Sequence, residues 1–406
     1  VPVGGNTGLT GATSAEDAIM VSLDRLKGVR SISREARTMV VGAGTILDDI
    51  HMAADAEGLI FPLIFGARGS ALIGGALSTN AGGSNVLRYG NTRDLCLGIE
   101  VVLPDGRVMD LMSRLHKDNA GYNLKHLFIG AEGTLGLITA AVLKLYPAPI
   151  IRATAMVGMA SLERALPLLN ALQEATGGAV EAFEYMPQSY IARHIEETGQ
   201  RAPFDGSHPV NILIEAASTR SDEAAPDADG TPRLKSIMEA LLAEAMEAGN
   251  IDDAVVAASE AQRREMWDRR ERAAELTFTG RPILDTDIAV PLEEVPAFLE
   301  KARARTEALD PGCEEFLVSH LGDGNIHYSV YITRDDPALS RTLMEAIEDL
   351  VLAHGGTFSA EHGIGLSKLG SMARRKDATA LKAMRSLKAA FDPKNLMNPG
   401  KVLPAL

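Results

Sequence analysis

Two histidines seven positions apart flank a short glycine-containing turn and could hold a metal ion. The sequence there runs His320-Leu-Gly-Asp-Gly-Asn-Ile-His327. Residues 315–319 and 328–332, on either side, are mostly apolar and β-prone. We therefore predict that His320 ends one strand and that His327 begins the next. Glycines in the turn can adopt positive φ, which lets both imidazoles point toward one position.

A carboxylate and a third imidazole follow downstream, at Glu361 and His362. Two histidines and one glutamate are a common ligand set for a divalent metal that keeps open coordination positions. We therefore predict His320, His327 and Glu361 as metal ligands. The alternative is that turn histidines merely cap backbone groups. It is the weaker alternative because two histidines share one turn and a Glu-His pair follows.

Three glycine-rich stretches in the first part of the chain are candidate ligand loops. Residues 3–11 present backbone N–H groups and small hydroxyls, which suit a pyrophosphate, the alternative being an ordinary glycine-rich turn. Residues 66–90 interleave glycine with Ser, Thr and Asn and are too glycine-rich for a stable helix interior. We predict that this backbone wraps a flat ligand with phosphates, the alternative being a long flexible loop. The third stretch covers residues 127–139.

Length and composition limit the partners and the compartment. A chain of 406 residues predicts two domains. The net charge of -14 and the lack of a basic cluster argue against nucleic acid as a partner. Cys96 and Cys313 lie in or beside strand-like runs and are predicted to be buried free thiols. No apolar run is long enough to span a membrane and no signal peptide is visible. We expect a cytoplasmic or organelle-matrix protein, or one peripheral to a membrane through its electron acceptor.

The pattern of elements changes near Pro147 and Pro149. Before them, strands alternate with the glycine-rich loops, and residues 97–111 predict a hairpin. After them, helices and strands alternate in an order that resembles two βαβ-type units on one antiparallel sheet. The sequence thus predicts an α+β protein with domains at 1–148 and 149–375. A C-terminal segment, 376–406, is expected to return to the first domain.

Taken together, these motifs resemble the FAD-linked 2-hydroxyacid dehydrogenases of the vanillyl-alcohol-oxidase/PCMH flavoprotein superfamily. That family includes D-lactate and D-2-hydroxyglutarate dehydrogenases and the FAD subunit of glycolate oxidase. The matching stretches follow the family's order and are residues 3–9, 69–75, 78–83, 129–136, 320–327, 359–365 and 391–401. The resemblance implies a PCMH-type FAD-binding domain and a ferredoxin-like α+β substrate/cap domain. It also leads us to expect that the N-terminal part of the FAD domain is missing from this chain.

The resemblance implies which residues bind FAD. The pyrophosphate loop would consist of Gly4, Gly5, Asn6, Thr7 and Gly8. The flavin and its ribityl chain would be lined by Pro62, Gly66, Ser70, Gly74, Gly75, Thr79, Asn80, Ala81 and Gly82. The adenosine side would be closed by Glu132, Gly133, Gly136 and Ile138, and Asn398 would return to the flavin from the tail.

The resemblance also implies the residues that act on the substrate. His320, His327 and Glu361 would bind zinc or manganese, and His362 would be the base beside the flavin. Arg270 would grip the substrate carboxylate. Ser329 would contact the substrate at a position where relatives often carry Asn. The region around Asp285 and Thr286 lacks a lysine that 2-hydroxyglutarate enzymes use, which weakens the case for a dicarboxylate.

The implied reaction oxidises a small D-2-hydroxy acid, D-lactate or a compound like D-2-hydroxyglutarate, to the 2-oxo acid. A hydride would pass to flavin N5 while His362 takes the hydroxyl proton with help from the metal. The acceptor would be a quinone, a cytochrome or an electron-transfer flavoprotein, and a homodimer stays open. One alternative is a truncated fragment without activity. The other is a metal-dependent hydrolase, which leaves the glycine-rich stretches unexplained.

The remaining histidines are predicted to have surface or packing roles without side-chain partners. They are His51, His116, His126, His194, His208 and His354. A covalent flavin link through one of them stays open.

Overall fold

The computed structural model describes residues 1–405 and divides the chain into two compact units. The first unit comprises residues 1–85 and 89–148 and the segment from Glu361 onward. The second unit comprises residues 86–88 and 149–360. The chain thus leaves the first unit after Ala148 and re-enters it at Glu361, earlier than the predicted return at residue 376.

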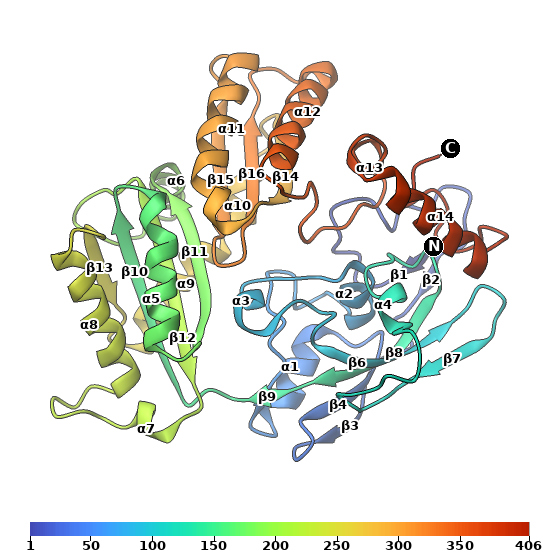
Figure 1. Ribbon diagram of the computed structural model, residues 1–406, viewed down its shortest axis with the longest axis horizontal. Coiled ribbons are helices and arrows are strands. Elements are labelled where there is room, and N and C mark those ends of the chain that lie inside the picture. Colours follow the sequence, from blue (N-terminus) through green and yellow to red (C-terminus); the bar gives the residue numbers. More distant parts are fainter. Residues whose placement is uncertain (406) are drawn as a thin grey trace. The chain divides into compact units, whose positions relative to one another are not determined.

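A five-stranded antiparallel sheet of order β3-β4-β8-β6-β7 organises the first unit (Figure 1). Its strands are β3 (Val29–Ser33), β4 (Thr38–Gly42), β6 (Cys96–Val102), β7 (Val108–Leu111) and β8 (Leu137–Lys144). Strands β6 and β7 form the predicted hairpin, which is confirmed. Alternate residues such as Met39, Val41 and Ile99 are fully buried in one core with helices α1 (Leu47–Asp55) and α2 (Ile73–Thr79). This is the period-two pattern of a sheet with one face against helices.

Short elements complete the first unit. They are the strand pairs β1 (Pro2–Val3) with β2 (Val21–Ser22) and β5 (Leu59–Ile60) with β9 (Tyr146–Pro147), and the helices α4 (Lys125–Phe128), α13 (Leu369–Arg375) and α14 (Ala378–Phe391). Helix α3 (Val86–Tyr89) lies where the two units divide along the chain. After α14 the carboxylate of Asp392 accepts the N–H groups of Leu396 (2.9 Å) and Met397 (2.8 Å). These two hydrogen bonds fix the turn that follows α14.

Helix α2 contradicts the prediction that residues 66–90 hold no helix. It contains Gly74 and Gly75, both weak helix formers. A Cβ on Gly74 would lie 2.8 Å from the Ala43 Cβ, so glycine is what lets this helix approach the residue after β4 so closely. Tertiary packing has overridden the local propensity.

A seven-stranded antiparallel sheet of order β13-β10-β12-β11-β15-β16-β14 organises the second unit. Its strands are β10 (Ile151–Met159), β11 (Val180–Pro187), β12 (Val210–Ser218), β13 (Asp253–Val256), β14 (Ile283–Ala289), β15 (Glu314–His320) and β16 (Asn325–Tyr331). The sheet consists of two halves, because β11 and β15 pair through two residues each. The predicted single antiparallel sheet is confirmed.

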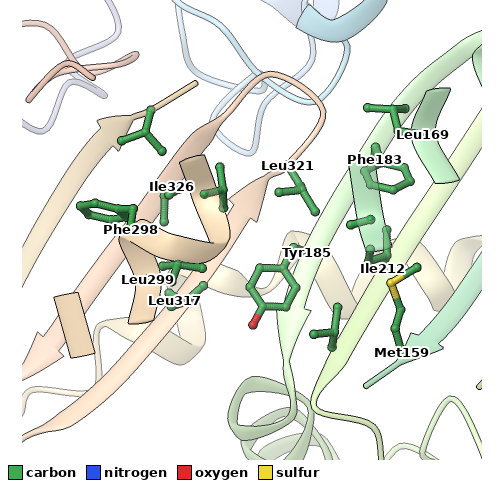
Figure 2. Close-up of a cluster of buried hydrophobic side chains, with 14 of the residues drawn as sticks. Met159, Leu169, Phe183, Tyr185, Ile212, Phe298, Leu299, Leu317, Leu321 and Ile326 are labelled. Carbon is green, nitrogen blue, oxygen red and sulfur yellow. The ribbon is translucent and has the colours of Figure 1, made fainter. Parts of the chain in front are cut away.

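Helices cover both faces of this sheet. One face carries α5 (Ala165–Ala175), α8 (Arg233–Glu247), α11 (Val295–Leu309) and α12 (Pro337–Ala353) (Figure 1). Figure 2 shows the core beneath them, with Tyr185 and Leu321 between the apolar groups of the two halves. The other face carries α6 (Gln188–Thr198), α9 (Glu260–Glu271) and α10 (Ala273–Thr277). The single turn α7 (Ser221–Ala224) lies in the polar loop before α8. This is the expected ferredoxin-like α+β arrangement.

Two further predictions can be compared with the structure. Both cysteines are free thiols, as predicted; Cys96 is buried, whereas Cys313 is partly exposed. Burial raises the pKa of the Cys96 thiol to about 12. Within residues 1–405, no helix combines the length and apolar character that a membrane crossing requires.

Candidate functional site

His320 and His327 share one face of the β15–β16 hairpin. His320 is the last residue of β15, as predicted, whereas His327 is the third residue of β16 rather than its first. Val318 pairs with His327, so the two histidines, two residues apart in register, point the same way. Their ring centroids are 5.4 Å apart, and they offer ring nitrogens within 4.8 Å of each other. That spacing brings both nitrogens within reach of one metal ion.

Strand β14 adds two carboxylates to the same face. Asp287 lies opposite His327 in the strand register, and Asp285 lies opposite Ser329. Asp287 offers a carboxylate oxygen within 4.8 Å of a His327 ring nitrogen. The hydroxyl of Ser329, predicted to contact substrate, donates to Asp285 over 2.6 Å. Sequence reasoning did not single out Asp287, although its two-residue spacing from Asp285 indicates a shared face.

Glu184 is the second residue that sequence reasoning missed. It lies on β11, is buried, and faces His320 across the two-residue pairing of β11 and β15. Nδ1 of His320 is 2.9 Å from each oxygen of its carboxylate, and Nε of Arg270 is 2.8 Å from one of them. The available signal was an acidic residue inside an otherwise apolar and aromatic run, 182–187.

The charges around Glu184 determine its ionisation. Burial alone would raise the pKa of this carboxyl, but its electrostatic interactions and hydrogen bonds with His320 and Arg270 hold the pKa below its ordinary value. Asp323, in the turn of the hairpin, shows the opposite outcome. Burial raises the pKa of Asp323 to about 6, because the opposing contributions of His320 and a backbone N–H are smaller. The site therefore contains one buried acid, Glu184, and one partly buried acid, Asp323, whose pKa values are shifted apart.

Glu361 and His362 begin the last segment of the first unit. The carbonyl of His362 accepts the Thr10 hydroxyl over 3.4 Å. Further along this segment, the N–H groups of Ile364 (2.7 Å) and Gly365 (2.8 Å) donate to the carboxylate of Glu132. The side chain of Glu132, predicted to close the adenosine side of FAD, is thus engaged with this segment. Burial raises the pKa of that carboxyl despite the two hydrogen bonds.

The predicted pyrophosphate loop and the predicted flavin-lining loop lie against each other in the first unit. A Cβ on Gly4 would lie 3.6 Å from Leu72, and one on Gly5 would lie 2.0 Å from the Ser70 carbonyl oxygen. Asn6 adopts positive φ beside them. Helix α2 follows and ends at Asn80, also in the left-handed region, whose side-chain oxygen accepts the Arg93 N–H. Backbone, rather than charged side chains, therefore dominates this part of the site.

Other predicted FAD residues have packing roles that the structure makes visible. A Cβ on Gly133 would lie 2.5 Å from Pro2, and one on Gly136 would lie 2.7 Å from Val101. Asn398 donates from its side-chain amide to the carbonyls of Ala12 (3.1 Å) and Glu132 (2.7 Å). Asn398 therefore connects the C-terminal tail to the chain segments that contain Ala12 and Glu132.

The first unit has features that fit a bound dinucleotide. A methyl group added at Gly8, Gly66 or Gly75 would meet no described atom within 4 Å beyond its chain neighbours, so space adjoins the backbone there. The side-chain oxygen of Asn398 is buried and lacks a hydrogen-bond partner among residues 1–405. Buried polar atoms usually have partners, so a ligand group is expected at this oxygen. The residues present fit FAD.

The other histidines are packing or surface residues, but the prediction that they lack partners is wrong for several. His354 Nδ1 lies 2.6 Å from a carboxylate oxygen of Glu294, and His51 Nε2 lies 3.0 Å from the Leu63 carbonyl. His208 lies 3.5 Å from Asp253. His194 has the predicted lack of partners, since both of its ring nitrogens are buried without a hydrogen-bond partner in the described part of the chain.

Two protein families match this chain. Residues 1–112 match the family described as FAD binding domain, and residues 148–402 match the family described as FAD linked oxidases, C-terminal domain. Among solved structures, an alkyldihydroxyacetonephosphate synthase superposes with a TM-score of 0.68. It is 17% identical and covers 98% of this chain and 72% of its own, so it shows the fold alone.

Curated relatives are similar along the whole chain. A D-2-hydroxyglutarate dehydrogenase of Xanthomonas citri pv. viticola is 34% identical over 99% of this chain and 83% of its own length. The mitochondrial D-2-hydroxyglutarate dehydrogenase of Bos taurus is 35% identical over 99% of this chain and 72% of its own length. With both matched families and this identity, the chain belongs to the FAD-linked oxidases and, among them, to the FAD-linked 2-hydroxyacid dehydrogenases that its motifs resemble.

Proposed function

We propose that this chain oxidises a small D-2-hydroxy acid to the corresponding 2-oxo acid, using FAD and a divalent metal. The observation that carries the proposal is the His320–His327 pair, in which His320 contacts the buried carboxylate of Glu184, and that carboxylate also contacts Arg270 of helix α9. Relatives over the full chain are named D-2-hydroxyglutarate dehydrogenases, and that name supports this substrate class.

The metal is proposed to bind to His320, His327 and Glu361, with zinc or manganese as candidates. Imidazole and carboxylate donors suit both ions. Covalent continuity supports Glu361 as the third ligand, because it follows Ala360 directly. The N–H of Ala360 donates to the Asp287 carbonyl of β14 over 3.2 Å. A metal bound there would lower the pKa of the substrate hydroxyl.

Oxidation removes one proton and one hydride from the hydroxy acid. We assign the hydroxyl proton to His362, because imidazole is a common general base and this histidine follows a proposed metal ligand. FAD, when bound, would supply the acceptor for the hydride that leaves C2. Arg270 is proposed to hold the substrate carboxylate. Its guanidinium has five donors, and the contact with Glu184 uses one of them.

The proposal also concerns the size of the substrate, a short hydroxy acid or a longer dicarboxylate. Asp285 accepts the hydroxyl of Ser329, so a carboxyl group, negatively charged when ionised, lies beside the proposed substrate contact. That charge favours a short substrate such as D-lactate, whereas the names of the relatives favour D-2-hydroxyglutarate. Both belong to the proposed class. The electron acceptor is proposed to be a quinone, a cytochrome or an electron-transfer flavoprotein.

Anaerobic bleaching of the flavin tests this proposal. The FAD-loaded protein is mixed with D- and L-lactate and with D- and L-2-hydroxyglutarate, and the flavin absorbance is followed. We expect rapid bleaching by at least one D-enantiomer and none by the L-enantiomers. Bleaching by none of them would contradict the proposed substrate class. A colourless protein that takes up no added FAD would instead support the fragment without activity.

A further inference from the structure

Glu184 occupies the point where the two halves of the second unit's sheet meet. Strands β11 and β15 pair through Glu184 with His320 and through Tyr185 with Ser319. Residues directly opposite on antiparallel strands have Cβ atoms about 4.5–5.5 Å apart, within reach of a direct side-chain contact. Glu184 is buried, so its carboxylate depends on protein partners for its hydrogen bonds.

The contacts of Glu184 determine which nitrogen of His320 carries a proton. Nδ1 of His320 is 2.9 Å from both carboxylate oxygens, and an ionised carboxylate can only accept. Nδ1 must therefore donate, which leaves the lone pair on Nε2. The geometry agrees, because the Arg270 guanidinium lies 3.5 Å from Nε2 and can only donate. A metal ligand needs that lone pair.

The same carboxylate holds Arg270. Its Nε lies 2.8 Å from Glu184, and its guanidinium is almost fully buried on helix α9. A buried guanidinium needs a counter-charge, and without one its desolvation would be expensive. Glu184 therefore contacts both a proposed metal ligand and the proposed substrate-binding cation.

We propose that Glu184 is a positioning residue that holds His320 in the Nδ1–H tautomer with Nε2 presented to the metal, and that fixes Arg270 for the substrate carboxylate. This inference rests on the proposed function. It follows a general rule that metal-binding histidines donate their other N–H to a carboxylate or carbonyl, which fixes both ring orientation and tautomer.

Glu181 provides a matched control on the same strand. It is also buried, and it pairs with Arg88, whose guanidinium nitrogen lies 3.0 Å from its carboxylate. The two glutamates thus share a strand, a degree of burial and an arginine partner. They differ in that Glu184 contacts a predicted metal ligand. Replacing each by Gln separates the loss of a buried ion pair from the loss of histidine positioning.

Metal affinity is the first readout. Zn²⁺ and Mn²⁺ affinities of the FAD-loaded wild type, Glu184→Gln and Glu181→Gln are measured by competition with a chromophoric chelator. We expect Glu184→Gln to bind metal about 10–100-fold more weakly and to show an altered absorption spectrum when loaded with Co²⁺. Glu181→Gln should match the wild type in both. Glu184→Gln should also raise KM for the hydroxy acid, because Arg270 loses its anchor.

Equal metal affinity in the wild type and Glu184→Gln would overturn the inference, as would an equal loss in both variants. A wild-type protein that binds neither metal would overturn the proposed metal site itself, before any variant is made. If the Glu184→Gln protein fails to fold, a measurement on the wild type still tests the inference. Histidine ¹⁵N NMR of the metal-free protein, with His320→Gln for assignment, should show His320 with its proton on Nδ1, and a proton on Nε2 would contradict the inference.

Discussion

In the first unit the candidate ligand site consists mostly of main chain, whereas in the second unit it consists of side chains. The loops around Gly8 and Gly66 leave open space beside the backbone. The hairpin of His320 and His327 instead depends on residues from other strands and from α9. A site of the first kind is specified by short stretches of sequence. A site of the second kind depends on how distant strands pair.

Removing one side chain from the proposed site that consists of side chains should slow the reaction without loss of bound FAD or metal. We expect His362→Ala to slow flavin reduction by the hydroxy acid at least ~100-fold, because a general base contributes roughly 10²–10⁴-fold. FAD and metal content should stay at wild-type values. Stopped-flow reduction and metal analysis check both points. Near-normal reduction in this variant would remove His362 from the role of base.

Adding one methyl group to the main-chain site should cost stability. Gly5→Ala would force a Cβ to within 2.0 Å of the Ser70 carbonyl oxygen, and we expect a loss of about 3 kcal/mol. Gly8→Ala is the matched control, since its new methyl group would meet no described atom within 4 Å. We expect the control to melt like the wild type without FAD and to bind FAD more weakly. Equal melting temperatures for the two variants would contradict the difference drawn between these glycines.

A smaller effect is expected from a buried histidine outside both sites. His194 is fully buried, and burial, with a contribution from Arg269, lowers its pKa from 6.5 to about 4. Between these values the unfolded chain binds a proton that the folded chain does not, so stability falls as the pH is lowered from 6.5 toward 4. The expected slope is at most about 1.4 kcal/mol per pH unit.

Melting temperatures measured from pH 7 to pH 5 check this expectation. His194→Leu should flatten the decline relative to the wild type, while His116→Leu, at an exposed position, should leave it unchanged. The same decline in wild type and His194→Leu would show that other groups cause it.

Local patterns were sufficient for much of the fold. The hairpin at residues 97–111 follows from its turn residues and apolar pattern, and the strand that ends at His320 follows from the β-prone run before it. Helix α2 was not predicted, because the reason for its glycines is the close contact of Gly74 with Ala43. Ala43 lies more than 30 positions before Gly74 in the chain. Local propensity carries no information about such a contact.

The candidate site shows the same limit. His320 and His327 stand in one motif and were identified directly. Glu184 lies 136 positions before His320, and it becomes relevant once β11 and β15 are known to be neighbours. Asp287 likewise gains its importance from pairing with His327 across β14 and β16. Strand order, which sequence periodicity does not encode, decides both.

The dependence of substrate oxidation on a metal at the His320–His327 hairpin is the central claim. It is tested by single-turnover flavin reduction with a D-2-hydroxy acid, before chelation, after chelation and after adding back Zn²⁺ or Mn²⁺. We predict that chelation slows reduction at least ~100-fold with FAD still bound, and that one of the two metals restores it. Reduction at the same rate in metal-free and metal-loaded protein would contradict the claim.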